Sequence, residues 1–185
     1  MGNRRGFCVE LEKREISMTE AVTTFKVRTA RTADVPALRG FLNEIIRIGG
    51  TTAHETPFTN ERFASHFLAG PGFVSCFVAE DGEGRPCAFQ ALERSDGLPD
   101  RWVDIGTFAR PHRKVPGAGS ALFAATRAHA RDAGFAAINA TIRADNVGGL
   151  AYYSRMGFID YKIDEAVPLK GGRRVDRISK RYLLE

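Results

Sequence analysis

A basic loop with two glycines stands between a predicted strand and a predicted helix, where it could bind an anion. The loop Arg113-Lys-Val-Pro-Gly-Ala-Gly-Ser120 follows the strand-like residues 101–109 and precedes an alanine-rich helical segment. The N–H groups and dipole at a helix N-terminus favour a phosphate, and glycine lets the chain approach it closely. The dinucleotide fingerprint is excluded because Leu122 replaces the third glycine, and no P-loop Gly-Lys-Ser/Thr follows. By itself the loop indicates either a phosphate site or a simple turn.

A second motif runs from Asn146 to Phe158 and reads Asn-x-x-Gly-x-x-x-Tyr-x-x-x-Gly-Phe. Asn146 is a favourable helix N-cap and Gly157 a favourable C-cap. Tyr153 lies seven residues after Asn146, so the two side chains share one helix face. A neutral tyrosine can donate a proton near pH 7. The motif alone is also consistent with an ordinary capped helix that buries its tyrosine.

An acidic residue occupies the strand that precedes the glycine loop. Alternation in residues 101–109 places Trp102, Asp104, Gly106 and Phe108 on one face. A carboxylate among such neighbours has a raised pKa unless it is paired. Such a carboxylate could exchange a proton near neutral pH. A structural aspartate paired with a nearby arginine is the alternative interpretation.

The elements that must position these residues follow from periodicity and turn residues. The predicted strands are 24–29, 73–80, 86–92, 101–109, 136–142, 158–167 and 173–184. The predicted helices begin after Thr32 and end at Gly49, then cover 60–68, about 118–133 and 146–156. Residues 73–92 should form an antiparallel hairpin, and strands 101–109 and 136–142 should be parallel because a helix connects them.

This order of strand, Gly117-x-Gly119 loop, helix, strand and Asn146 helix resembles the GNAT superfamily of N-acetyltransferases over about residues 24–165. The family loop reads Gln/Arg-x-x-Gly-x-Gly/Ala; here Lys114 replaces the usual Arg or Gln, and Pro116 lacks an N–H donor. The resemblance implies an α/β fold with a mixed, mainly antiparallel sheet, a central β-α-β cofactor unit and flanking helices. It also implies acetyl-CoA as the co-substrate.

The resemblance further implies roles for individual residues. An oxyanion donor is expected among the backbone N–H groups near Phe108 and Ala109. Tyr153 is expected either to protonate the coenzyme A thiolate or only to hydrogen-bond the sulfur. The expected acetyl-CoA-binding residues are Phe108, Ala109, Arg113, Lys114, Val115, Gly117, Ala118, Gly119, Ser120 and Asn146.

Two segments are similar to the phosphinothricin acetyltransferase branch of this superfamily: the loop Thr51–Phe58 and the sequence Asp104-Ile-Gly-Thr-Phe108. That branch uses a carboxylate on the fourth strand as general base, usually the longer Glu, and Asp104 takes this position. It often has His where this chain has Tyr153. The similarity places loop 51–58 at the acceptor pocket, so His54 and Glu55 are candidates for substrate binding. A solvated loop is the alternative.

We therefore expect an enzyme that acetylates the amine of a small molecule, amino-acid-like molecules included, by direct transfer in a ternary complex. The alternative is a non-catalytic acyl-CoA-binding module, which would keep Gly117 and Gly119 without needing Asp104 or Tyr153. The resemblance favours a homodimer.

Length and composition exclude other classes. With 185 residues and 43% hydrophobic residues, the chain can bury one core, which we expect within residues 24–185 after a loose extension at 1–23. No apolar run approaches the roughly 20 residues that cross a bilayer, so no membrane partner is expected. The net charge is +5, yet the basic C-terminal strand lacks interleaved aromatic residues beyond Tyr182, so no nucleic-acid partner is expected.

Cysteine and histidine spacing predicts no metal site. Cys8, Cys76 and Cys87 form no Cys-x-x-Cys pair, and an odd number of thiols favours a reduced, cytoplasmic protein. Cys76 lies in an apolar run and is expected to be buried and inert. The four histidines, His54, His66, His112 and His129, share no metal-ligand spacing, and His66 and His129 are expected on helix surfaces.

Overall fold

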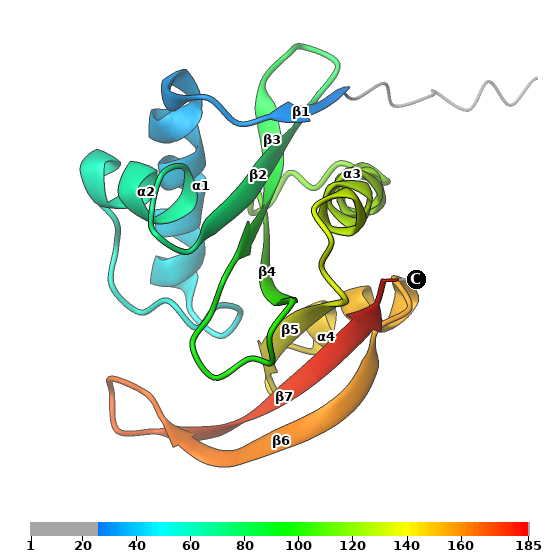
Figure 1. The fold of residues 1–185 in the computed structure, drawn as a ribbon. Coiled ribbons are helices and arrows are strands. Elements are labelled where there is room, and N and C mark those ends of the chain that lie inside the picture. The colour runs from blue at the N-terminus through cyan, green and yellow to red at the C-terminus, as the bar shows by residue number, and fades with distance from the viewer. Residues whose placement is uncertain (1–25, 185) are drawn as a thin grey trace, which may run out of the picture.

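A seven-stranded sheet with helices on both faces forms the computed structural model, which describes residues 26–184 (Figure 1). The strands are β1 (Lys26–Thr29), β2 (Phe73–Glu80), β3 (Pro86–Glu93), β4 (Trp102–Ala109), β5 (Ala137–Arg143), β6 (Ile159–Pro168) and β7 (Arg174–Leu183). The helices are α1 (Val35–Ile48), α2 (Asn60–Phe67), α3 (Ala118–Asp132) and α4 (Val147–Arg155), with a 3-10 turn at Thr32–Asp34 before α1. The extension expected at residues 1–23 lies outside the described residues.

The strand order is β1-β2-β3-β4-β5-β7-β6, and only the β4–β5 pair is parallel. The predicted mixed, mainly antiparallel sheet with a central β-α-β unit is therefore confirmed. The β4–β5 pairing covers only Trp102–Asp104 against Ala137–Asn139. Because pairing stops at Asp104, the later part of β4 keeps its β3 neighbour and leaves its other edge without a strand partner among the described residues.

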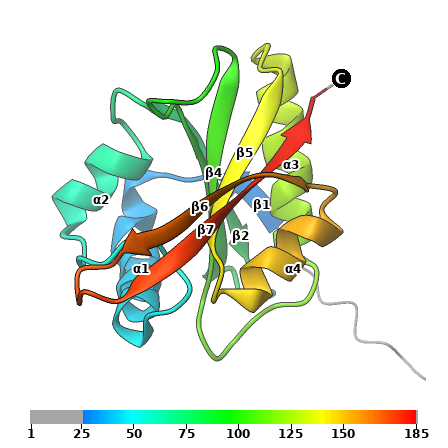
Figure 2. The same cartoon turned by 90° about the horizontal axis from the view of Figure 1, so that it is seen from below.

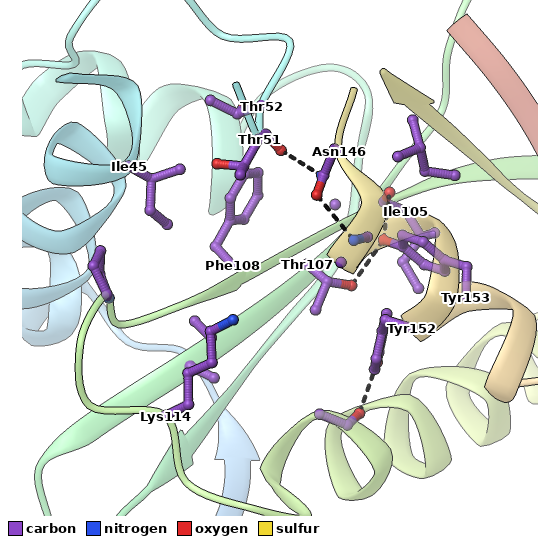
Figure 3. A pocket seen from close by; sticks show the side chains of 18 of the residues that line it. Ile45, Thr51, Thr52, Ile105, Thr107, Phe108, Lys114, Asn146, Tyr152 and Tyr153 are labelled. Atoms are coloured by element: carbon purple, nitrogen blue, oxygen red, sulfur yellow. Dashed lines mark hydrogen bonds between the residues drawn. The ribbon is translucent and has the colours of Figure 1, made fainter. Parts of the chain in front are cut away.

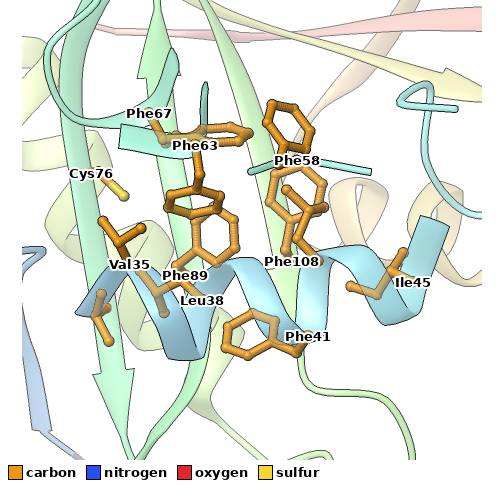
Figure 4. Close-up of a cluster of buried hydrophobic side chains, with 13 residues drawn as sticks. Val35, Leu38, Phe41, Ile45, Phe58, Phe63, Phe67, Cys76, Phe89 and Phe108 are labelled. Atoms are coloured by element: carbon orange, nitrogen blue, oxygen red, sulfur yellow. The ribbon is translucent and has the colours of Figure 1, made fainter. Parts of the chain in front are cut away.

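Helices α1 and α2 cover one face of the sheet, and α3 and α4 cover the other (Figures 1 and 2). Phenylalanine rings fill the α1/α2 side, where Phe63 and Phe89 are fully buried (Figure 4). The Phe89 ring stacks on Phe108 of β4 with 4.8 Å between ring centroids. This packing fixes the face of β4 that carries Asp104 and Gly106. None of the described helices has the length and apolarity that crossing a membrane requires.

Candidate active site

A cavity of about 1000 Å³ opens beside the unpaired edge of β4. Its walls come from the end of α1, the loop that follows α1, strands β3 to β5, the loop before α3, and α4 (Figure 3). Such a volume is at the upper end of the range for small-molecule sites in proteins. Asp104, Tyr153 and the glycine loop, which the sequence singled out separately, all line it.

The glycine loop ends in an anion-binding helix N-terminus. Gly117 is the N-cap of α3 with φ of +83°, in the left-handed region that favours glycine. The Ala121 N–H donates to the Gly117 carbonyl at 3.0 Å and so begins the helical hydrogen bonding. By helix geometry, the N–H groups of Gly119 and Ser120 have no acceptor within α3. These two amides can therefore bind a phosphate group.

The flanking loop residues contribute unequally. Val115 and Ala118 line the cavity, but their side chains pack into a small core cluster with Leu122, so their backbones are what the cavity can use. Lys114 is exposed and lines the cavity. Arg113 is exposed and does not line the cavity. The position of Arg113 therefore does not support its expected contact with acetyl-CoA.

The register of β4 decides which backbone amide faces the cavity. Arg110 N–H donates to the Cys87 carbonyl of the β3 side at 2.9 Å. Successive N–H groups of a strand point to opposite edges, so the amide of Phe108 also faces β3 and the amide of Ala109 faces the open edge. Of the two residues expected near the oxyanion, Ala109 thus offers the free donor, whereas Phe108 offers its ring as a wall.

Asp104 lies where β4 and β5 separate. Its Oδ1 accepts a hydrogen bond of 2.6 Å from Asn139 Nδ2 on β5. Burial raises the pKa of Asp104 to about 6, the Asn139 hydrogen bond opposes this, and the nearby charge of Glu93 adds to it. Among residues 26–184, no arginine or lysine lies within ion-pair distance of this carboxylate. The structure therefore does not contain the alternative, a structural aspartate paired with an arginine.

The Tyr153 hydroxyl is held in a buried network that the sequence did not reveal. It lies 2.9 Å from Thr107 Oγ1 and donates to the Ile105 carbonyl at 3.4 Å. Gln90, fully buried on β3, donates from Nε2 to Thr107 Oγ1 at 2.8 Å and to the Tyr152 hydroxyl at 3.2 Å. Burial raises the pKa of Tyr153, which keeps its hydroxyl protonated at neutral pH.

Tyr152 is the second tyrosine of α4 that lines the cavity. Its hydroxyl donates to the Gly119 carbonyl at 2.8 Å and thereby ties α4 to the first turn of α3. A Cβ on Gly119 would lie 2.9 Å from the Tyr152 ring, which explains why glycine is needed at that position. Only its place beside Tyr153 in the sequence could have drawn attention to this residue.

Loop 51–58 is folded against the cavity, and its two candidate residues have different surroundings. His54 lines the cavity and packs edge-on against Phe58 and Phe67, with ring centroids 5.2 and 5.9 Å away. Burial lowers the pKa of His54 to about 4, so it is neutral at pH 7. Glu55 does not line the cavity; its carboxylate accepts from the Lys170 N–H at 3.0 Å in the β6–β7 turn. Glu55 thus holds the loop rather than facing a ligand there.

Asn146 closes the same loop onto α4. Its Oδ1 accepts from the Gly149 N–H at 2.9 Å as an N-cap, and its Nδ2 donates to the Thr51 carbonyl at 2.9 Å (Figure 3). Each end of the amide thus makes one hydrogen bond within the protein, and Asn146 also lines the cavity, where its contact with acetyl-CoA stays a prediction. The residue supports the site by positioning α4 and the loop.

Replacement of Asn146 by Ala should lower the free energy of unfolding by about 0.5 to 2 kcal/mol, because α4 loses its N-cap. Urea denaturation measures this loss. Asn60→Ala is the matched control, since Asn60 is exposed in the first turn of α2, where Thr59 supplies the cap. Equal stability of the two variants would contradict the capping role.

Two expectations about other residues are decided by the structure. Cys76 is fully buried, as expected, and burial raises its pKa to about 12, which keeps the thiol protonated at neutral pH. His66 lies at the helix surface only in part, because its side chain is 36% exposed while its ring packs 4.4 Å from Phe67 and 5.5 Å from His54, between centroids. Its Nε2 lies 3.5 Å from Glu93 Oε2. In the described residues, no group of three or more acidic, cysteine or histidine side chains could hold a metal ion.

Comparisons with known proteins agree with this architecture. The model of the acetyltransferase (GNAT) family matches residues 41–158. Among curated protein sequences, none matches this chain significantly.

Solved structures of several acetyltransferases share the fold. A phosphinothricin acetyltransferase from Sinorhizobium meliloti in complex with acetyl-CoA is 22% identical, with a TM-score of 0.76 over 87% of this chain and 89% of that chain. An N-acetyltransferase from Staphylococcus aureus Mu50 is 17% identical, with a TM-score of 0.78 over 88% and 100%. A ribosomal-protein-alanine N-acetyltransferase from Brucella melitensis is 22% identical, with a TM-score of 0.73 over 86% and 99%.

At these identities the solved structures establish a common fold and leave the acceptor open. The family match covers more than half of the 185 residues and includes β4, the glycine loop and α4. The chain belongs to the acetyltransferase (GNAT) family and is an acyltransferase.

Proposed function

We propose that this enzyme transfers the acetyl group of acetyl-CoA to the amine of a small molecule by direct attack in a ternary complex. The observation that carries the proposal is the placement of Asp104. Its carboxylate, with a pKa raised to about 6, lines the same cavity as the anion-binding N-terminus of α3. A carboxylate with this pKa is ionised at neutral pH and still basic enough to receive a proton.

The residues present fit acetyl-CoA. The amides of Gly119 and Ser120 and the exposed side chain of Lys114 would bind the pyrophosphate. The open edge of β4 would receive the extended pantetheine arm, since its unpaired backbone groups need partners. The Sinorhizobium meliloti enzyme of the same fold binds acetyl-CoA, which supports this assignment.

Three groups of the chain would then act on the reaction. Asp104 takes a proton from the attacking ammonium, directly or through water. The Ala109 N–H at the open edge of β4 stabilises negative charge on the carbonyl oxygen of the thioester. Tyr153, whose raised pKa keeps its proton in place, protonates the departing sulfur.

The glycine loop provides a test of cofactor binding. Gly117→Val should weaken acetyl-CoA binding at least 10-fold, because a branched side chain is strained at φ of +83° and obstructs the anion. Calorimetry with acetyl-CoA measures the affinity. Gly84→Val is the matched control for backbone strain, since Gly84 has φ of +74° in the β2–β3 turn and does not line the cavity. Unchanged affinity in Gly117→Val would contradict the proposed pyrophosphate site.

Release of coenzyme A thiol in the presence of a panel of amines tests the activity as a whole. We also propose, from the sequence, that a single domain begins at about residue 24, that the protein is cytoplasmic and that it forms a homodimer. Analytical ultracentrifugation of the full chain tests the oligomeric state.

A further inference from the structure

The acceptor side of the cavity combines apolar walls with two carboxylates. Phe67, Phe108 and His54 form an aromatic wall on the α1/α2 face. Asp104 and Glu93 lie opposite each other in the β3–β4 register and both line the cavity. Since the Glu93 charge raises the pKa of Asp104, the two side chains share one electrostatic environment.

One basic residue that lines the cavity, Arg143, is paired with an acidic neighbour. Arg143 lines the cavity, yet Nε and one terminal nitrogen donate to both Asp145 oxygens, at 2.9 and 2.7 Å. Arg173 donates to the same carboxylate, and the charge of Glu55 also acts on Arg143. Arg143 is therefore already paired with a carboxylate and is not a free cation for a ligand.

The remaining basic side chains of the cavity belong to its cofactor side. Lys114 and His112 stand on the loop before α3, and Arg155 lies near Tyr152, which is bonded to α3. His54, although on the acceptor side, is neutral at pH 7 because burial lowers its pKa to about 4. An anionic group of an acceptor bound beside Asp104 would thus meet Glu93, whose Oε2 lies 3.5 Å from Nε2 of His66, and no unpaired cation among the lining residues.

We propose that the acceptor is a primary amine with an aliphatic or aromatic body and no carboxylate next to the amine, and that Glu93 selects it. This inference rests on the proposed acetyl transfer. The ammonium would be attracted by Glu93 and Asp104, and its apolar body would pack against the aromatic wall. An amino acid would place its own carboxylate beside two others, an unfavourable like-charge contact. The expected acceptor therefore differs from the amino-acid-like molecules that the sequence resemblance included.

Matched pairs of acceptors, measured with the full-length protein, test whether a carboxylate next to the amine makes a compound a poorer acceptor. The pairs are 2-phenylethylamine with phenylalanine, and isoamylamine with leucine; leucinamide carries a neutral group of similar size in place of the carboxylate. One readout is kcat/KM from thiol release with saturating acetyl-CoA. The other is calorimetric binding of each compound to the protein saturated with coenzyme A. We expect each amine to exceed its amino acid at least 10-fold, with leucinamide closer to the amine than to leucine.

Glu93→Gln should reduce this preference at least 5-fold, mainly through a lower KM for the amino acid relative to the amine, because the neutral amide no longer repels the carboxylate of the acid. Glu83→Gln is the control, since Glu83 is exposed in the β2–β3 turn and pairs with Arg85. Circular dichroism melting of both variants confirms that they fold; Glu93 is at the end of β3 and partly exposed, so its replacement should be tolerated.

The outcomes are distinguishable. Equal or better use of the amino acids, or rejection of leucinamide as strongly as leucine, overturns the inference. An unchanged preference in Glu93→Gln overturns the role of that residue. If the amines bind better than the amino acids but no thiol is released, the preference for amines without a carboxylate is supported and the proposed acetyl transfer is refuted. Absence of both binding and turnover for every amine overturns the acceptor class.

Discussion

Asp104→Asn should acetylate an accepted amine about 10² to 10⁴ times more slowly than the parent enzyme, which is the usual range for general base assistance. The substitution keeps the shape of the side chain, and an amide oxygen can still accept the 2.6 Å hydrogen bond from Asn139. What is lost is the ability to take the proton of the ammonium. The loss should therefore appear in kcat, with acetyl-CoA affinity unchanged, when chemistry limits the rate.

The pH dependence gives a second signature. The parent rate should rise through about pH 6 as Asp104 ionises, and this acidic limb should be absent in Asp104→Asn. Because the folded-state pKa is raised above the ordinary value of 3.8, ionisation of Asp104 costs stability as pH rises from about 4 to 6. The variant, relative to the parent, should thus gain in melting temperature over that interval. Asp96→Asn, in the exposed β3–β4 loop, is the control.

Wild-type rates in Asp104→Asn with chemistry rate-limiting would contradict the general base assignment. If the variant is slower but its rate still falls below about pH 6, a group other than Asp104 must be the one that titrates there. Glu93, beside Asp104 in the register, would then be the next candidate to replace.

Local patterns in the sequence predicted the elements and the face of β4 that carries Asp104. Alternation in residues 101–109 and the N-cap at Asn146 depend on neighbours within one strand or one helical turn, and the structure contains both. The predicted element ends differ from those observed by at most one or two residues. Fraying of helices and strands at their ends accounts for differences of this size.

Contacts between distant segments were not predictable. Three such contacts depend on the final chain path: the insertion of β7 between β5 and β6, the docking of Glu55 on Lys170, and the pairing of Arg173 with Asp145. Gln90 gave a faint signal, as a polar residue within the apolar strand Pro86–Glu93. Its partners on β4 and α4 could be known only once these elements were packed together.

Tyr153→Phe should slow acetyl transfer about 10²- to 10⁴-fold while leaving acetyl-CoA affinity within about twofold, the pattern of a lost general acid. The network around the hydroxyl supports this direction of proton movement. Gln90 can only donate from Nε2, so Thr107 Oγ1 accepts from it and has its own proton free for Tyr153. The Tyr153 proton is then directed to the Ile105 carbonyl at the open edge of β4, along which the pantetheine arm is proposed to lie.

Tyr152→Phe is the matched control for this prediction, because Tyr152 is the neighbouring tyrosine on α4 and its proton is committed to the Gly119 carbonyl. It should change kcat less than 10-fold, with any larger effect on acetyl-CoA affinity through the first turn of α3. Burial raises the pKa of both tyrosines, so neither should impose an alkaline limb below about pH 9. A greater loss of kcat in Tyr152→Phe than in Tyr153→Phe would transfer the role of proton donor to Tyr152. Comparable turnover in both variants and the parent would mean that the thiolate leaves without protonation by either residue.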